Sequence, residues 1–229
     1  MNLRVLFGFA SMLAATGCGI SESSRVESPV IRPDKILDFN TLFSENCAGC
    51  HGRDGGGGLA RALADPEYLA IANDTVIRTV AAKGVAGTAM SAFAQSAGGS
   101  LTDAQIDAIV SGIRTHWAKA DALAGANPPP YASDVPGDAT RGSVAYETFC
   151  ASCHGANGRG GERASSIVDP TYLALVSDQS LRTTVIAGRR DLGSPDWRSD
   201  VPGKAMTNEE VSDVVAWLVS QRPQMSARR

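Results

Sequence analysis

A pattern of two cysteines and one histidine occurs twice in the sequence, and it is the feature with the clearest chemical meaning. Residues 47–52 read CAGCHG, and residues 150–155 read CASCHG. Cysteines separated by two residues can form a redox-active disulfide or ligate zinc, and with a histidine directly after them they can attach a c-type haem. Which of these applies depends on the other cysteines and histidines in the chain.

The remaining cysteines and histidines are too few for zinc. Outside the two motifs the chain has only Cys18 and His116, whereas a structural zinc site takes four such ligands. Residues three and four apart share a face of a helical turn, so both thiols and the imidazole of one motif can meet a single porphyrin. Because the motif is repeated in a chain that we expect to be secreted, we favour two covalently bound haems c over a disulfide pair. The predicted thioether residues are Cys47, Cys50, Cys150 and Cys153, and the predicted iron ligands are His51 and His154.

The similarity between the two copies continues beyond the motifs. Residues 65–69 (DPEYL) match residues 169–173 (DPTYL), and Thr102 matches Thr207. A stretch rich in proline and glycine separates the copies and is typical of a stiffened linker. The expected organisation is a signal peptide (1–17), a flexible tether (18–33), a first domain (34–120), a linker (121–138), a second domain (139–223) and a C-terminal tail (224–229).

Helical signals open and close each copy. Apolar residues with helical spacing precede each motif, within residues 36–43 and 144–149. Thr102 with Gln105, and Thr207 with Glu210, fit the capping box that starts a helix. No run alternates apolar and polar residues for long enough to form a sheet. We therefore predict an all-α fold for both domains.

The order of these parts resembles the class I c-type cytochromes, which are small all-α domains. The shared order is an opening helix, CxxCH, a glycine-rich loop, a methionine-bearing loop and a closing helix with an aromatic residue. The resemblance implies two cytochrome-c-like domains in tandem, with opening and closing helices that cross closely at a glycine and an aromatic residue. The pairs that fit are Gly142 with Trp217, and Phe39 with Gly112, where the large and small residues have exchanged sides.

The sixth iron ligand differs between the copies. Met90 lies in the loop before Thr102, where the resembled family places its methionine ligand, and the alternative is that Met90 only fills the core. The aligned residue in the second copy is Ser194, which is a poor ligand for ferrous haem. The tentative replacement is Met206, although it aligns with Leu101 as a hydrophobic staple residue. An open or water-bound iron is the main alternative to Met206, followed by Lys204 and His116.

Two arginines occupy matching positions in the two copies. Arg78 and Arg182 fall in helical stretches, and a guanidinium can bind a haem propionate in bidentate geometry. The alternative is that both are ordinary surface arginines. We include both as candidate cofactor-binding residues.

The N-terminus has the features of a secretory signal. Arg4 precedes an apolar run over residues 5–13, and small residues then lead to Cys18. We expect cleavage and lipidation at Cys18. The alternatives are cleavage without lipidation, an uncleaved anchor, or an unprocessed free cysteine. The protein would then be extracytoplasmic, on the periplasmic side, and held to the membrane by lipid.

These features predict a dihaem electron carrier. The net charge of −3 disfavours a nucleic-acid partner. The expected partners are redox proteins or a membrane respiratory or photosynthetic complex, of which the chain could be a subunit. The alternative is a haem enzyme that reacts with peroxide, oxygen or nitric oxide at a second haem without methionine. We expect a carrier rather than an enzyme, because no histidine lies near the second loop to act as a distal acid.

Overall fold

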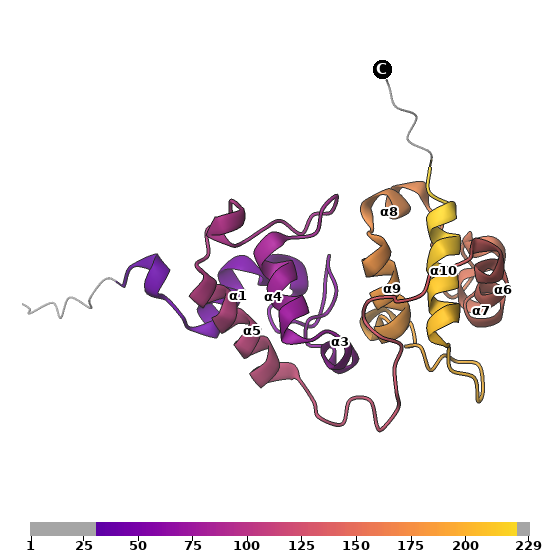
Figure 1. Cartoon of the computed structure of the whole chain (residues 1–229), viewed down its shortest axis with the longest axis horizontal. Helices are drawn as coiled ribbons and strands as arrows, with labels where there is room; N and C mark the ends of the chain where they lie inside the picture. The colour runs from indigo at the N-terminus through magenta and orange to yellow at the C-terminus, as the bar shows by residue number, and fades with distance from the viewer. Residues whose placement is uncertain (1–30, 224–229) are drawn as a thin grey trace, which may run out of the picture. The chain divides into compact units, whose positions relative to one another are not determined.

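The structure of the chain is a computed structural model, and it describes residues 31–223. The expected signal peptide, Cys18, most of the tether and the C-terminal tail lie outside these residues. Within them the regular structure is helical and contains no strand, only two isolated bridges (Figure 1). The predicted all-α class is confirmed. None of the described helices combines the length and the apolar character needed to cross a membrane.

The first domain contains five α-helices. α5 contacts both α1 and α4, so the closing helix is the element around which the others pack. Two short 3-10 turns, Pro33–Lys35 and Gln95–Ala97, lie at its start and before α5. The helices are α1 (Phe39–Asn46), α2 (Ala48–His51), α3 (Pro66–Ile71), α4 (Asp74–Lys83) and α5 (Asp103–Trp117).

The second domain repeats the same order of helices. Its closing helix, α10, lies beside α6 and α9 (Figure 1). Its short 3-10 turns, Ala156–Gly158 and Arg190–Leu192, fall at different places from those of the first domain. The helices are α6 (Ala139–Phe149), α7 (Ala151–His154), α8 (Pro170–Leu175), α9 (Asp178–Ala187) and α10 (Asn208–Ser220).

The closing helices begin as the sequence predicts. The Thr102 hydroxyl accepts a hydrogen bond from the Gln105 amide, and the Gln105 side chain accepts one from the Thr102 amide. Thr207 and Glu210 form the same reciprocal pair at 3.1 and 2.9 Å. Each box satisfies two amides that the first turn of a helix leaves without partners. Both predicted capping boxes are confirmed.

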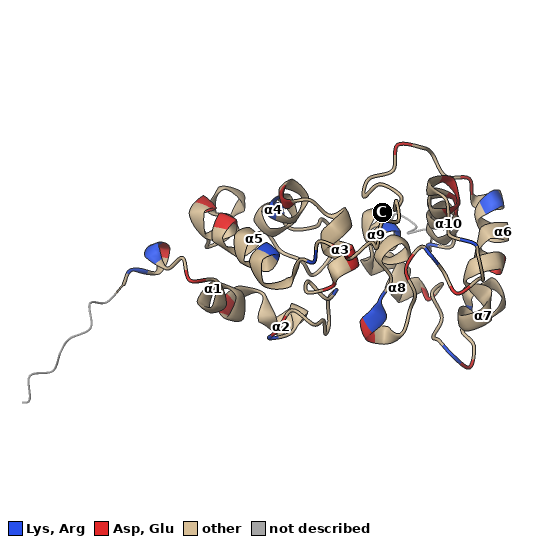
Figure 2. Cartoon of the chain, turned by 90° about the horizontal axis from the view of Figure 1, so that it is seen from below, with Lys and Arg blue, Asp and Glu red and all other residues tan. Residues whose placement is uncertain are grey.

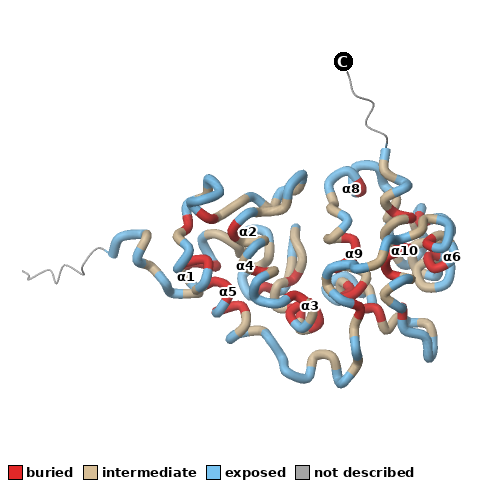
Figure 3. Tube along the Cα trace, viewed as in Figure 1, coloured by how far each residue is buried: buried red, intermediate tan, exposed pale blue. Residues whose placement is uncertain are grey.

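The helix crossings also follow the prediction. A Cβ atom on Gly112 would lie 2.0 Å from the ring of Phe39, and one on Gly142 would lie 2.8 Å from the Cβ of Trp217. Both predicted pairs are therefore in contact. Burial is concentrated on the inner sides of the closing helices, which supply the apolar centre of each domain (Figure 3).

The segment between the two domains is held in place by side chains of α9. The carbonyl oxygens of Pro130 and Tyr131 accept hydrogen bonds from Arg182, and that of Tyr131 accepts another from Gln179. Over the described residues, acidic and basic residues are both scattered along the two domains, in line with the small net charge (Figure 2).

Candidate functional site

The first CxxCH motif forms a single short helical turn. Cys47 lies between α1 and α2 as the capping residue of both, and its amide donates to the Phe43 carbonyl. α2 stops at Gly52, whose φ of +81° lies in the region that favours glycine, and a Cβ there would lie 2.6 Å from the carbonyl oxygen of Gly57. The chain therefore turns sharply after His51. Within the motif, the amides of Cys50 and His51 both donate to the Cys47 carbonyl, which keeps both cysteines and the histidine on one helical turn.

A backbone contact fixes the orientation of His51. Its Nδ1 atom lies 2.8 Å from the carbonyl oxygen of Arg61. A carbonyl oxygen only accepts hydrogen bonds, so the proton resides on Nδ1 and the lone pair of Nε2 is free for a metal. Burial lowers the pKa of His51, although the bond to Arg61 opposes this shift. The imidazole is thus neutral and oriented, as an iron ligand must be.

The second motif repeats this geometry. His154 Nδ1 lies 2.9 Å from the carbonyl oxygen of Ser165. Gly155, with φ of +73°, ends α7, and a Cβ there would lie 2.1 Å from the Gly160 carbonyl oxygen. The Tyr146 hydroxyl donates to the Gly155 carbonyl at 2.6 Å and ties the turn to α6. Both histidines are therefore held by a carbonyl of the loop that follows them.

All four motif cysteines are free thiols. Burial raises the pKa of Cys47 and of Cys150 to about 11, so both carry their protons at neutral pH. Among the described residues, no group of three histidine, cysteine or acidic side chains could hold a metal ion by itself. Two free thiols beside an imidazole with an available Nε2 fit a haem attached through thioethers.

The loops that follow α4 and α9 place Met90 and Ser194 at equivalent positions. The Val85 amide donates to the Met90 carbonyl at 2.8 Å, and the Arg189 amide donates to the Ser194 carbonyl at 3.1 Å. The predicted alignment of Met90 with Ser194 is therefore confirmed for the main chain.

The structure gives Met206 the position of a core residue. Its amide donates to the Trp197 carbonyl at 2.8 Å, as that of Leu101 does to Phe93. Met206 and Leu101 are each 6% exposed and belong to the hydrophobic cores of their domains. Packing in the core therefore accounts for Met206, and its role as an iron ligand stays a prediction.

The other candidates have partners of their own. Arg78 donates to Asp107 at 2.6 Å and to Asp103 at 2.9 Å. Arg182 is buried, and its guanidinium donates to Ser212 and Asn208 as well as to the linker carbonyls. Both arginines thus already have partners within the protein, and their contacts with haem propionates stay predictions. Of the remaining candidates, Lys204 lies over the ring of Phe149, and the ring of His116 stacks on Phe39.

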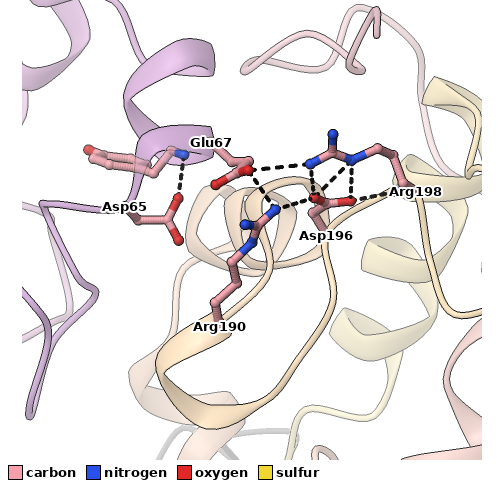
Figure 4. Close-up of polar contacts among 6 residues, drawn as sticks. Asp65, Glu67, Arg190, Asp196 and Arg198 are labelled. Carbon is pink, nitrogen blue, oxygen red and sulfur yellow. Dashed lines mark hydrogen bonds and ion pairs between the residues drawn. The ribbon is translucent and has the colours of Figure 1, made fainter. Parts of the chain in front are cut away.

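Sequence reasoning missed a polar network between the two domains. Glu67 of α3 contacts Arg190 and Arg198 of the second domain, and both arginines also pair with Asp196 (Figure 4). Arg61 reaches the same domain, donating to Thr184 at 2.9 Å and to the Gly188 carbonyl at 3.2 Å. The signal that could have found these residues is their lack of a charged counterpart in the other copy.

Two family models match separate parts of the chain. Residues 139–222 match the family described as Cytochrome c, and residues 35–111 match the family described as Cytochrome C oxidase, cbb3-type, subunit III. A search of curated proteins found no match.

Two solved structures are similar to parts of the chain. "Dihydro-heme d1 dehydrogenase NirN in complex with DHE" aligns at 28% identity over 41% of this chain and only 17% of that chain, with a TM-score of 0.31. A component of the Kuenenia stuttgartiensis reducing HAO-like protein complex aligns at 17% identity over 85% of this chain and all of that chain, with a TM-score of 0.48.

Proposed function

Because the chain carries two cytochrome c domains in tandem, we propose that it is a dihaem electron carrier that passes single electrons between extracytoplasmic redox partners. Cytochrome c domains imply covalently bound c-type haem and a role in haem-based electron transfer. The observation that carries the finer proposal is the duplicated motif, in which free thiols accompany a histidine held through Nδ1 by a carbonyl.

Each motif has a defined role in this proposal. Cys47 and Cys50 attach the first haem and His51 ligates its iron, while Cys150, Cys153 and His154 do the same in the second domain. A bound haem c supplies a centre that gains and loses one electron. The Arg61 and Ser165 carbonyls orient the two imidazoles by accepting from Nδ1, which leaves Nε2 of each ring available.

The opposite side of the iron distinguishes the two domains. Met90 is the proposed sixth ligand in the first domain, where a thioether favours ferrous iron. In the second domain Ser194 takes the equivalent main-chain position. The proposed ligand there is Met206, with an open or water-bound iron as the main alternative, followed by Lys204 and His116. This difference is the basis of the second candidate function, an enzyme that reacts with peroxide, oxygen or nitric oxide.

The charges near Ser194 favour the carrier. Burial by itself would raise the pKa of Asp196, but hydrogen bonds from Arg198 and Arg190 outweigh this effect and lower the pKa. A hydrogen bond from Arg189 likewise lowers the pKa of Asp191. Both carboxyl groups are therefore ionised at neutral pH and hold no proton to donate to a bound oxygen species, as reductive chemistry requires.

The proposed location and partners follow from the N-terminal sequence. A lipid at Cys18 and the tether after it would hold the domains near the membrane on the periplasmic side. Redox proteins, or a membrane respiratory or photosynthetic complex, would then be within reach as donors and acceptors. The contacts with them would be small and transient, as is usual for electron transfer.

Absorption spectroscopy of the holoprotein tests the proposal. Ferric and ferrous spectra would be recorded before and after carbon monoxide for the wild type, Met90→Ala and Met206→Leu. Met206→Leu is the matched variant, because leucine occupies the equivalent position in the first domain. We expect two haems that are reduced and reoxidised reversibly, and we expect Met90→Ala to remove a methionine-to-iron charge-transfer band.

The same spectra separate the two candidate functions. If Met206→Leu also removes a charge-transfer band, a methionine is the sixth ligand of both irons, and the enzymatic function is ruled out. If half of the wild-type haem binds carbon monoxide and turns over peroxide, oxygen or nitric oxide, the carrier proposal is wrong. An open second iron without turnover supports the carrier.

A further inference from the structure

We propose that Arg61 and Glu67 are positioning residues by which the first domain holds the Ser194 loop of the second domain and sets the properties of the second haem. The Ser194 loop is defined here as residues 188–198. This inference rests on the proposed function in taking the second domain to bind haem. It concerns side chains of one domain that act on the site of the other.

Arg61 connects the two sites directly. Its carbonyl oxygen holds Nδ1 of His51, while its guanidinium donates to the Thr184 hydroxyl and to the Gly188 carbonyl. Gly188 is the first residue of the Ser194 loop. One residue therefore joins the imidazole of the first motif to the start of the loop in the second domain.

Glu67 acts on the remainder of the loop. Its side chain is 5% exposed, and Oε1 lies 2.5 Å from Arg190 and 3.3 Å from Arg198 (Figure 4). Arg190 precedes Ser194 and Arg198 follows it, so a single carboxylate from the first domain spans the loop. Asp196, 6% exposed, binds the same two arginines from within the loop.

The Glu67 carboxylate is placed for these contacts rather than for general stability. Its second oxygen, Oε2, is buried and has no hydrogen-bond partner within the described residues. A buried carboxylate oxygen without a partner is costly, so its two arginine contacts must offset that cost. Removing the charge would leave two arginines compensated by Asp196 alone.

The residues of this network are replaced by uncharged residues in the other copy. The histidine of the second motif is held by Ser165, so Ser165 is the equivalent of Arg61, and Thr171 is the equivalent of Glu67. The loop of the first domain carries Ala86, Ala92 and Ala94 where the Ser194 loop carries Arg190, Asp196 and Arg198. The shared fold therefore does not require this contact. In it, side chains of the first domain bind a loop of the second, and the reverse contact is not made.

We expect the network to stabilise the main chain of the Ser194 loop. Arg189 and Ser194 exchange two backbone hydrogen bonds, of 3.1 and 2.9 Å, that close the loop. The contacts from Arg61 and Glu67 lie on both sides of this closure. Loosening them increases the opening of the loop, which hydrogen exchange at the two amides measures.

The test compares Glu67→Gln with Asp103→Asn in the full-length holoprotein. Asp103→Asn is the matched control, because it also removes a carboxylate from an arginine, but at the exposed pair with Arg78 within the first domain. The readouts are hydrogen exchange at the Arg189 and Ser194 amides, by nuclear magnetic resonance of the ferrous protein, and the midpoint potential of each haem. Met90→Ala identifies the signals of the first haem.

We expect Glu67→Gln to speed exchange at both amides by about tenfold or more. We also expect it to shift the midpoint potential of the second haem and leave that of the first unchanged, whereas Asp103→Asn alters neither the exchange at these amides nor the potential of the second haem. If a folded Glu67→Gln protein matches the wild type in exchange and potential, the proposal is wrong. Arg190→Gln provides a second test if Glu67→Gln does not fold, because half of the Arg190 side chain is exposed. We expect the same faster exchange at both amides, and unchanged exchange would overturn the proposal.

The outcomes separate this proposal from the proposed function. Altered exchange in Glu67→Gln, in a protein that does not act as an electron carrier, would support the positioning role and refute the carrier. Unchanged exchange and potential in a competent carrier would refute the positioning role alone.

Discussion

The loops around Met90 and Ser194 share a backbone but differ in chemistry. Each begins at a glycine with positive φ, Gly84 or Gly188, and each is closed by the same amide-to-carbonyl hydrogen bond. The first loop has Ala86, Met90, Ala92 and Ala94 where the second has Arg190, Ser194, Asp196 and Arg198. The difference shows that the main chain of a repeat can be preserved while its side chains take on another task, here binding to the neighbouring domain.

The helix crossings differ in a similar way. In the first domain Gly112 accepts the ring of Phe39, which also packs against Trp117. In the second domain Gly142 approaches the backbone of Asp213, whose carboxylate binds Arg141 at 2.8 Å through two nitrogens. One crossing is therefore made by an aromatic side chain, and the other by close backbone contact and an ion pair.

The largest expected effect comes from removing one pair of thiols. We expect Cys150→Ser with Cys153→Ser to leave one covalently attached haem, and the same to hold for Cys47→Ser with Cys50→Ser, because thioethers require the thiols. Mass spectrometry of the denatured protein measures the number attached. Two attached haems in either double variant would contradict the assignment of the motifs.

Ser194→Met tests whether the two loops differ only in the ligand that they offer. The serine lies at the main-chain position of Met90, so we expect a methionine there to ligate the second iron and raise its midpoint potential. Carbon monoxide binding at the second haem would be lost. Ser194→Leu is the control, since leucine has similar bulk and no sulfur. Equal spectra of the two variants would show that the charged loop keeps residue 194 away from the iron.

Replacing the crossing glycines compares the two domains in stability. A Cβ on Gly142 would lie 2.0 Å from the Asp213 carbonyl oxygen, and backbone cannot rotate away. A Cβ on Gly112 meets a phenylalanine ring that can turn. We expect Gly142→Ala to lower the free energy of unfolding by about 3 kcal/mol and Gly112→Ala by about 1 kcal/mol. Denaturant titration followed at each haem measures both, and a reversed order would contradict the packing argument.

The smallest expected effect is an acid dependence confined to the second domain. Burial would raise the pKa of Asp213, but hydrogen bonds from Arg141 and the Asp138 amide lower it overall. A carboxyl group with a lowered pKa stabilises the fold above its unfolded value, about 3.9, and this contribution is lost as the pH falls through the folded pKa. We expect Asp213→Asn to be less stable at pH 7 and to lose less stability below about pH 4.

Hydrogen exchange of the α10 amides as a function of pH measures this dependence. The α5 amides provide the control, because Ala108 takes the position of Asp213 in the first domain. If the wild type and Asp213→Asn lost the same stability below about pH 4, the ion pair would add none.

The sequence was sufficient for the features set by local spacing. The capping boxes at Thr102 and Thr207 depend on residues three apart, and the glycine crossings followed from the family resemblance. The contacts of Glu67 with Arg190 and Arg198 could not be predicted in this way, because they join residues more than one hundred positions apart. Their only trace in the sequence is a set of charges present in one copy and absent from the other.

The direction of the contact between the domains has a consequence for assembly. A surface that binds a different surface on an identical unit can add units without limit and form a filament. Here Arg61 and Glu67 of the first domain have no charged counterparts in the second, and Arg190 and Arg198, which bind Glu67, have none in the first. A further unit would meet Ser165 and Thr171 at one end and alanines at the other. This contact therefore cannot be repeated to add a third unit of the same kind.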